Sequence, residues 1–165
     1  MKLSENMFSD EIKKEIDLIR QKFPKDKPKS SIIESLLLIQ HKNGYISEES
    51  IQSLASYLNV QRIDVYEVAS FYSMFYLKPV GKNTISVCTN VSCMLRNSDE
   101  IVNYIEKKLK IKTGESTKDN KFYLKDEMEC LAACDGAPMM QVNHINYENL
   151  TFEKIDKILD GINDD

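Results

Sequence analysis

The 165-residue sequence predicts an α+β protein, with an N-terminal helical bundle over residues 1–79 and an α/β domain over residues 80–165. Two observations support this division. Before Pro79, apolar residues recur every three or four positions, which is the pattern of amphipathic helices. After Pro79, polar and apolar residues alternate from Thr84 to Val87, which is the pattern of a strand with one buried face.

The first of four expected helices ends at Pro24, because proline lacks the amide hydrogen that a helix interior needs. Its apolar face is formed by Ile12, Ile16, Ile19 and Phe23. A second helix is expected over 32–41. Ser31 and Glu34 have the spacing of a capping box at its start, and Asn43-Gly44 provides a left-handed turn at its end.

Ser47 is expected to cap a third helix, followed by two acidic residues that suit the positive end of a helix. Its buried face contains Ile51, Leu54, Ala55 and Leu58. The fourth helix is expected to continue almost to Pro79, with Val65, Val68, Ala69, Tyr72, Phe75 and Tyr76 on it. The aromatic residues at its end, together with Phe71, are interpreted mainly as core, with a partner-binding surface as the alternative.

In the second region, a strand leads directly into Cys88, and Ser98 is expected to cap the helix that follows. Short strands are predicted over 122–126 and 139–143, the latter with a hairpin return, and Thr151 is expected to cap a last helix. The order strand, helix, strand, strand, helix is that of a thioredoxin-like domain. The α/β domain is therefore predicted to be thioredoxin-like.

All four cysteines lie in two short motifs beside expected strands. VCTNVSC separates Cys88 from Cys93 by four residues, and CLAAC separates Cys130 from Cys134 by three. Four thiolates without histidine suit soft metals, either zinc or an iron–sulfur cluster. Structural zinc usually uses pairs with two intervening residues, so the wider spacings favour a [2Fe-2S] cluster ligated by four cysteines. Zinc, disulfide redox chemistry and unrelated buried cysteines remain alternatives.

Composition restricts the classes of function. The net charge of −4 argues against binding to a nucleic-acid backbone as the main task. The longest apolar run, over 32–39, is interrupted by a glutamate and is too short to span a bilayer. The N-terminal residues have the features of neither a secretory signal nor a transit peptide, so a cytoplasmic location is expected. Thiols are kept reduced in that compartment.

The residues around the cysteines resemble a known family. The stretches VYEVASFYSMFYLKPVGKNTISVCTNVSCMLRNSDEI and GESTKDNKFYLKDEMECLAACDGAPMMQVNHINYENLT are similar to the thioredoxin-like [2Fe-2S] ferredoxin component of NADH:quinone oxidoreductase, respiratory complex I. The resemblance is strong over about 60–160. It implies one [2Fe-2S] cluster on Cys88, Cys93, Cys130 and Cys134, the positions that match the family's ligands.

The resemblance also implies the partners and the reaction. The partner would be the flavoprotein subunit that binds NADH and FMN, in the peripheral arm of the complex on the cytoplasmic side of the membrane. The chain itself has no dinucleotide fingerprint, and its expected role is one-electron exchange with the reduced flavin. The alternatives are the equivalent subunit of an NAD-linked hydrogenase or formate dehydrogenase, and a non-redox interaction module stabilised by zinc.

Four positions near the cysteines carry further expectations. Ala132 and Asn90 stand where many or some relatives have glycine, and alanine adopts a positive φ only at a cost. Pro138 is a candidate for a cis peptide bond, because it follows the second cysteine motif and precedes a strand. Arg96 is expected either to offset the cluster's charge or to be solvated. The two histidines are expected to be ordinary surface residues.

Overall fold

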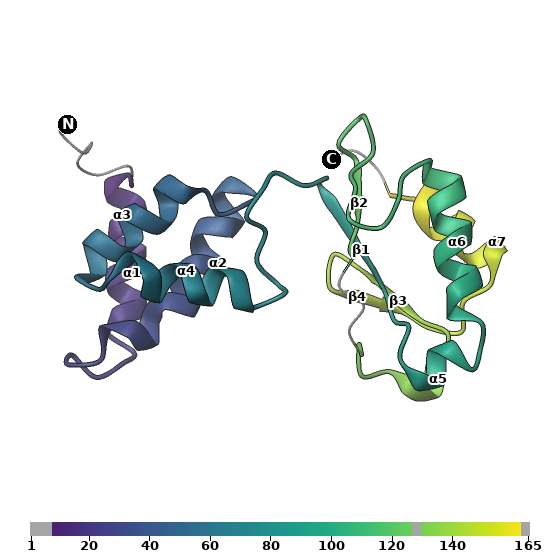
Figure 1. Ribbon diagram of the computed structural model, residues 1–165, viewed down its shortest axis with the longest axis horizontal. Coiled ribbons are helices and arrows are strands. Elements are labelled where there is room, and N and C mark those ends of the chain that lie inside the picture. The colour runs from purple at the N-terminus through teal and green to yellow at the C-terminus, as the bar shows by residue number, and fades with distance from the viewer. Residues whose placement is uncertain (1–7, 127–129, 163–165) are drawn as a thin grey trace. The chain divides into compact units, whose positions relative to one another are not determined.

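The computed structural model describes residues 8–126 and 130–162. The chain divides into two compact units, Met1–Pro79 and Val80–Asp165 (Figure 1). The first unit contains helices only and the second contains the sheet, so the predicted α+β class is confirmed. No helix in the described part of the chain is long and apolar enough to cross a membrane.

The first unit is a bundle of short helices around one apolar core. Its elements are α1 (Asp10–Arg20), the 3-10 helix η1 (Pro28–Ser31), α2 (Ile32–Asn43), α3 (Glu48–Leu58) and α4 (Arg62–Phe71). Ser9 and Ser47 cap α1 and α3 through their hydroxyl groups, and Gly44 ends α2 with a φ of 81°. The most deeply buried side chains are Ile16, Leu36, Ile39, Ile46, Leu54 and Val65.

Two boundary predictions in this unit were wrong. The first helix ends at Arg20, so Phe23 lies in the following loop. Ser31 does not form a capping box with Glu34, because its hydroxyl donates to the carbonyl of Pro28 at 2.7 Å within η1. The unit has such a cap elsewhere, where the Asp64 carboxylate accepts a hydrogen bond from the amide of Gln61 at the start of α4.

The fourth helix also ends earlier than predicted, at Phe71, and Tyr72 has an extended backbone. The segment after it forms hydrogen bonds with earlier parts of the unit instead of continuing the helix. The amide of Ile46 donates to the Tyr76 carbonyl at 2.7 Å, and the Gln40 side chain donates to the Met74 carbonyl at 2.8 Å. This turn buries Phe75 in the core of the unit, while Phe71 and Tyr72 are exposed. Most of the aromatic cluster is therefore not core.

The second unit is a four-stranded sheet with helices. Its elements are β1 (Asn83–Val87), α5 (Val91–Met94), α6 (Ser98–Leu109), β2 (Phe122–Leu124), the 3-10 helix η2 (Cys134–Gly136), β3 (Met140–Val142), β4 (Ile145–Tyr147) and α7 (Phe152–Asp160). The strand order is β2-β1-β3-β4, with β1 parallel to β2 and the other neighbours antiparallel. The helix α6 is the crossover that a parallel pair requires.

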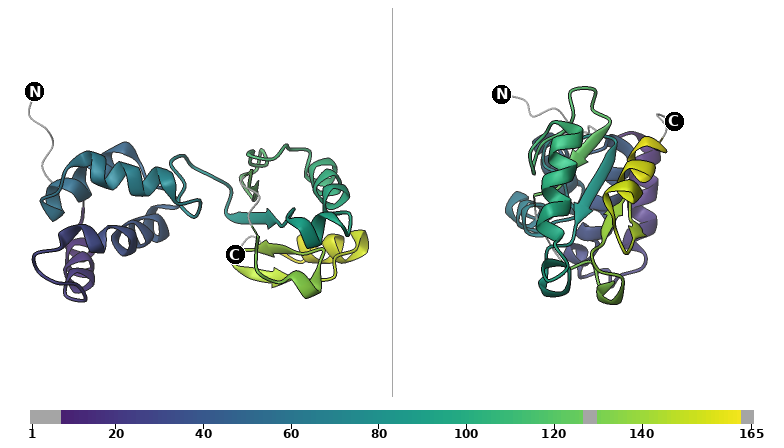
Figure 2. Two further views of the ribbon diagram at one scale, coloured as in Figure 1. Left: turned by 60° about the horizontal axis from the view of Figure 1, so that its bottom comes forward. Right: turned by 90° about the vertical axis from the view of Figure 1, so that its right-hand side faces the viewer.

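Helices α6 and α7 cover the same face of this sheet (Figures 1 and 2). Ile105 of α6 and Ile155 of α7 are fully buried against Ile85 and Leu124 of the sheet. Thr151 caps α7 as predicted, since its hydroxyl accepts from the amide of Lys154. The face that α6 and α7 cover therefore forms the core of the unit, and the cysteines lie outside it.

Ser98 does not cap α6 as predicted. It is the first residue of the helix, and Asn97 precedes it with a left-handed φ of 64°. The Ser98 hydroxyl is buried and, among the described residues, has no hydrogen-bond partner. Serine was therefore a misleading signal at this position.

A four-cysteine candidate cluster site

The first cysteine pair lies at the carboxyl end of β1. Cys88 follows the last residue of the strand, and its amide donates to the carbonyl of Met139 at 3.1 Å. Cys93 lies in the short helix α5. Both side chains are buried, with exposed fractions of 3% and 1%. The sheet therefore fixes the first pair, because β1 and the segment entering β3 are neighbours.

The second pair lies in the loop that leads into β3. Cys130 and Cys134 are both exposed, and Cys134 begins η2. Figure 1 shows this loop beside α5, and α5 contacts η2. Leu131 and Ala133 of the loop pack against a small apolar cluster that contains both buried cysteines. Two segments about forty residues apart in the sequence therefore meet at one place.

The structure places thiols of the two motifs near one another in pairs, and none of the four forms a disulfide. The Cys88 thiol lies close enough to those of Cys93 and Cys130 for them to lower its pKa, and the Cys130 thiol lies close enough to Cys134 to raise that of Cys134. These contacts are pairwise. Within residues 8–126 and 130–162, no group of three or more histidine, cysteine, aspartate or glutamate side chains is arranged to hold a metal ion directly.

The thiols differ in acidity. Burial acts to raise the pKa of Cys88, but hydrogen bonds from the amides of Leu131 and Asn90 and from the neighbouring thiols outweigh it, so this pKa is lowered. Burial and then the Cys88 thiol raise the pKa of Cys93 to about 11. The Cys130 thiol raises the pKa of Cys134. The thiol whose pKa is lowered is therefore Cys88, where two backbone amides face the sulfur.

This donor set fits an iron–sulfur cluster. Four cysteine sulfurs without histidine are the ligands that [2Fe-2S] and [4Fe-4S] clusters use. Backbone amides also point at the sulfurs, from Leu131 and Asn90 to Cys88 and from Met139 to Cys93. Such hydrogen bonds stabilise the negative charge of a thiolate-bound cluster. Sequence reasoning missed these donors and had no signal for them, because every residue type except proline has a backbone amide.

Ala132, between the second pair of cysteines, has a left-handed backbone with a φ of 57°. Asn90 has an ordinary φ of −69°, so no glycine is needed there. The peptide bond before Pro138 is cis. Both histidines are exposed. The one departure from the family pattern with a structural consequence is therefore the alanine at 132.

We expect Ala132→Gly to stabilise the protein by about 0.5–1 kcal/mol, because a left-handed backbone costs roughly 1–2 kcal/mol at a non-glycine residue and glycine's greater unfolded-state entropy offsets part of the gain. Urea unfolding of the full chain measures this difference. Ala133→Gly is the matched control, since Ala133 has a φ of −124° and needs no glycine. The control should be destabilised. A loss of stability in Ala132→Gly would show that the strain is not real.

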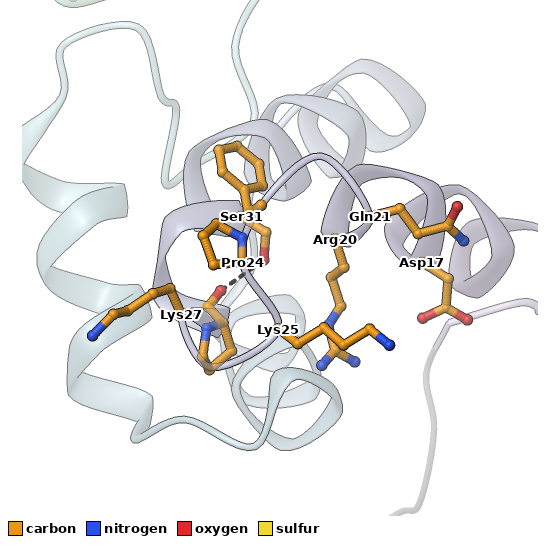
Figure 3. A pocket seen from close by; sticks show the side chains of 9 residues that line it. Asp17, Arg20, Gln21, Pro24, Lys25, Lys27 and Ser31 are labelled. Atoms are coloured by element: carbon orange, nitrogen blue, oxygen red, sulfur yellow. Dashed lines mark hydrogen bonds between the residues drawn. The ribbon is translucent and has the colours of Figure 1, made fainter.

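A separate cavity of about 630 Å³ lies in the helical unit, between the end of α1 and the loop that follows it. Figure 3 shows the side chains that line it, with Lys27 directed to the opposite side from Lys25. Its other lining residues are Asp17, Arg20, Gln21, Phe23, Pro24, Pro28 and Ser31. No cysteine lines this cavity, so it does not belong to the thiol site.

The comparisons with known proteins identify the family of the chain. Residues 16–163 match the family model described as thioredoxin-like [2Fe-2S] ferredoxin. The chain is 46% identical over 150 residues to the E subunit of an NADH-quinone oxidoreductase from Rickettsia bellii, covering 90% of this chain and 89% of that protein. It is 42% identical over 156 residues to an NADH dehydrogenase [ubiquinone] flavoprotein 2 of Dictyostelium discoideum, covering 94% of this chain and 63% of that protein.

Among solved structures, an NAD+-reducing [NiFe]-hydrogenase in the H2-reduced state matches with a TM-score of 0.64 and 21% identity. The match covers 78% of this chain and 22% of the hydrogenase chain, and at this identity it supports the fold alone. The family predicted from the quoted motifs is confirmed by the family model and by the curated relatives. The chain belongs to the thioredoxin-like [2Fe-2S] ferredoxin family.

Proposed function

We propose that this chain is the electron-transfer subunit of an NADH:quinone oxidoreductase, exchanging single electrons with the FMN of a partner flavoprotein subunit. The observation that supports the proposal is that thiols from two loops remote in sequence lie near one another, in a chain of this family. Bound there, a [2Fe-2S] cluster accepts and releases one electron at a time. NADH and FMN belong to the partner, because this chain has no dinucleotide fingerprint.

Cys88, Cys93, Cys130 and Cys134 are the proposed ligands. The buried pair provides a rigid half of the site, since β1 and α5 fix its backbone. The exposed pair provides the half that faces solvent. A site that is closed on one side and open on the other keeps the cluster in the protein while leaving one side within reach of an electron donor.

The proposed docking surface for the flavoprotein subunit is formed by Val91, Met94 and Leu95, on α5 and directly after it. These apolar side chains are 63%, 50% and 74% exposed. They lie beside the second cysteine loop, since α5 contacts η2, which begins at the exposed Cys134. Exposed apolar groups around a redox site are typical of a surface that a partner covers.

Reduction by NADH tests this proposal. We expect NADH to bleach the visible absorbance of the cluster only when the flavoprotein subunit is present. Leu95→Asp should weaken binding of that subunit at least tenfold, because a charge at the centre of an apolar contact must lose its water. Ile145→Asp is the control, since Ile145 is similarly exposed at 60% but lies on β4. Equal binding by both variants would place the docking surface elsewhere.

The alternative assembly is an NAD-linked hydrogenase or formate dehydrogenase, and the fold likeness to a hydrogenase chain is the observation that favours it. The Rickettsia bellii relative favours the respiratory complex, because it is far more similar in sequence and nearly equal in length to this chain. The complex would hold this chain on the cytoplasmic side of the membrane. Co-purification decides between the assemblies: membrane-arm subunits support the respiratory complex, and a hydrogenase or formate dehydrogenase subunit contradicts it.

A further inference from the structure

We infer that Arg96 is a positioning residue for the cluster, because its side chain ties the segment after Cys93 to the loop that carries the second cysteine pair. The inference rests on the proposed function in one respect, namely that the four thiols hold a single cluster. It assigns to Arg96 a structural contact with the backbone, where the sequence pointed only to charge or solvation.

The contact joins the two cysteine motifs directly. The Arg96 amide donates to the carbonyl of Cys93 at 3.0 Å, so the residue is anchored to the end of α5. Its guanidinium then donates through Nη1 to the carbonyl of Ala137 at 2.9 Å. Ala137 is only 1% exposed and lies three residues after Cys134. A buried carbonyl that loses its hydrogen-bond donor lowers the stability of the folded state. The contact should therefore contribute to stability although the arginine itself is exposed.

Three consecutive carbonyls, those of Gly136, Ala137 and Pro138, each accept a hydrogen bond. The amide of Asn149 donates to the Gly136 carbonyl at 2.6 Å, and the amide of Leu150 donates to the Pro138 carbonyl at 2.9 Å. The segment after β4 therefore bonds the carbonyls on either side of Ala137. Arg96 bonds the one between them, from the opposite cysteine motif. Without Arg96, the carbonyls of Gly136 and Pro138 would keep their bonds to the 149–150 segment, and the Ala137 carbonyl would lose its bond to the segment after α5.

Met139, which follows Pro138, contacts both residues of the first cysteine pair. The amide of Met139 faces the sulfur of Cys93, and its carbonyl accepts from the amide of Cys88 at 3.1 Å. Cys93 is thus connected to Met139 in two ways. One is direct, through the Met139 amide, and the other runs through the hydrogen bonds of Arg96 and the chain from Ala137 to Met139. A shift at Ala137 would therefore change the hydrogen bond on the Cys93 sulfur as well as the position of Cys134.

Charge is the lesser part of the effect. Glu100 and Glu153 line the same hollow of about 280 Å³ as Arg96, so the arginine's charge has acidic residues nearby besides the thiols. The planar guanidinium also offers a directed donor that the flexible ammonium of lysine does not reproduce. Lysine at this position should therefore keep the charge and lose the alignment.

The test compares Arg96→Lys and Arg96→Met in the full chain with its cluster loaded. The control is Lys107→Met, which removes an exposed charge from the neighbouring helix α6. The readouts are the rate of iron loss to an excess of chelator, followed by visible absorbance, and the EPR line shape of the reduced cluster. We expect both Arg96 variants to lose iron about tenfold faster, because a buried carbonyl loses a charged donor, and to show a broadened signal. The control should match the unmodified chain.

Two results would overturn the inference. If Arg96→Lys behaves like the unmodified chain and only Arg96→Met differs, charge and not the hydrogen bond is what matters. If neither Arg96 variant differs from Lys107→Met, the arginine has no role at the site. Far-UV circular dichroism of each loaded variant shows whether the chain is folded. An unmodified chain that binds no iron would instead refute the proposed function, so the two failures are distinguishable.

Discussion

Replacing any one of the four cysteines with serine should lower the iron content of the purified chain from about two atoms to less than about a fifth of that. A serine hydroxyl is a harder and weaker ligand than a thiolate, and soft sulfur ligands are what hold iron–sulfur clusters. The effect should be largest at Cys88 and Cys93, because both are buried and a serine there also buries a hydroxyl. Elemental analysis and visible absorbance measure the loss.

Met94→Ser is the matched control for this series. Met94 adjoins Cys93 on α5 and also carries sulfur, but it is half exposed and is not a proposed ligand. Its iron content should stay unchanged. Full iron in any one of the cysteine variants would remove that residue from the ligand set.

Gly136→Ala should disrupt the second cysteine loop, with a destabilisation of about 1–3 kcal/mol and a parallel loss of cluster. A Cβ added at Gly136 would lie 2.6 Å from the Cβ of Glu148, where no ordinary contact is possible. The loop cannot move away easily, because the Gly136 carbonyl is bonded by the amide of Asn149 and Gly136 ends η2, which begins at Cys134. Thermal unfolding and iron content of the full chain measure the two effects.

A second variant separates this clash from a general intolerance of change. Glu148→Gly removes the side chain that the new Cβ would meet. The double variant should therefore recover most of the iron and stability that Gly136→Ala loses. If the double variant is as poor as the single one, the contact with Glu148 is not the cause.

The sequence predicted the helices and strands best where the signal was local. Ser47 and Thr151 cap helices as expected, because an N-cap depends on a few neighbouring residues. Ser31 and Ser98 look the same in sequence but do not cap: one bonds a carbonyl within a 3-10 turn, and the other is buried after a left-handed Asn97. The spacing of polar residues does not reveal which backbone conformation surrounds them.

Long-range contacts explain the remaining differences. The helical pattern continued past Phe71, yet the chain turns there, since Gln40 and Ile46 of the preceding segments bond the stretch that follows. In the candidate site, the four proposed ligands could be selected from cysteine spacing. The backbone groups around them could not be predicted. The amides of Leu131 and Met139 and the carbonyl of Ala137 are present whatever the residue type, so no sequence pattern identifies them.

The central claim is that the four thiols hold one [2Fe-2S] cluster, and EPR of the anaerobically purified chain before and after reduction by dithionite tests it most directly. We expect visible absorbance that bleaches on reduction, no signal in the oxidised state, and one S = 1/2 signal accounting for about one spin per chain when reduced. A colourless protein with about one tightly bound zinc per chain and no signal would contradict the account.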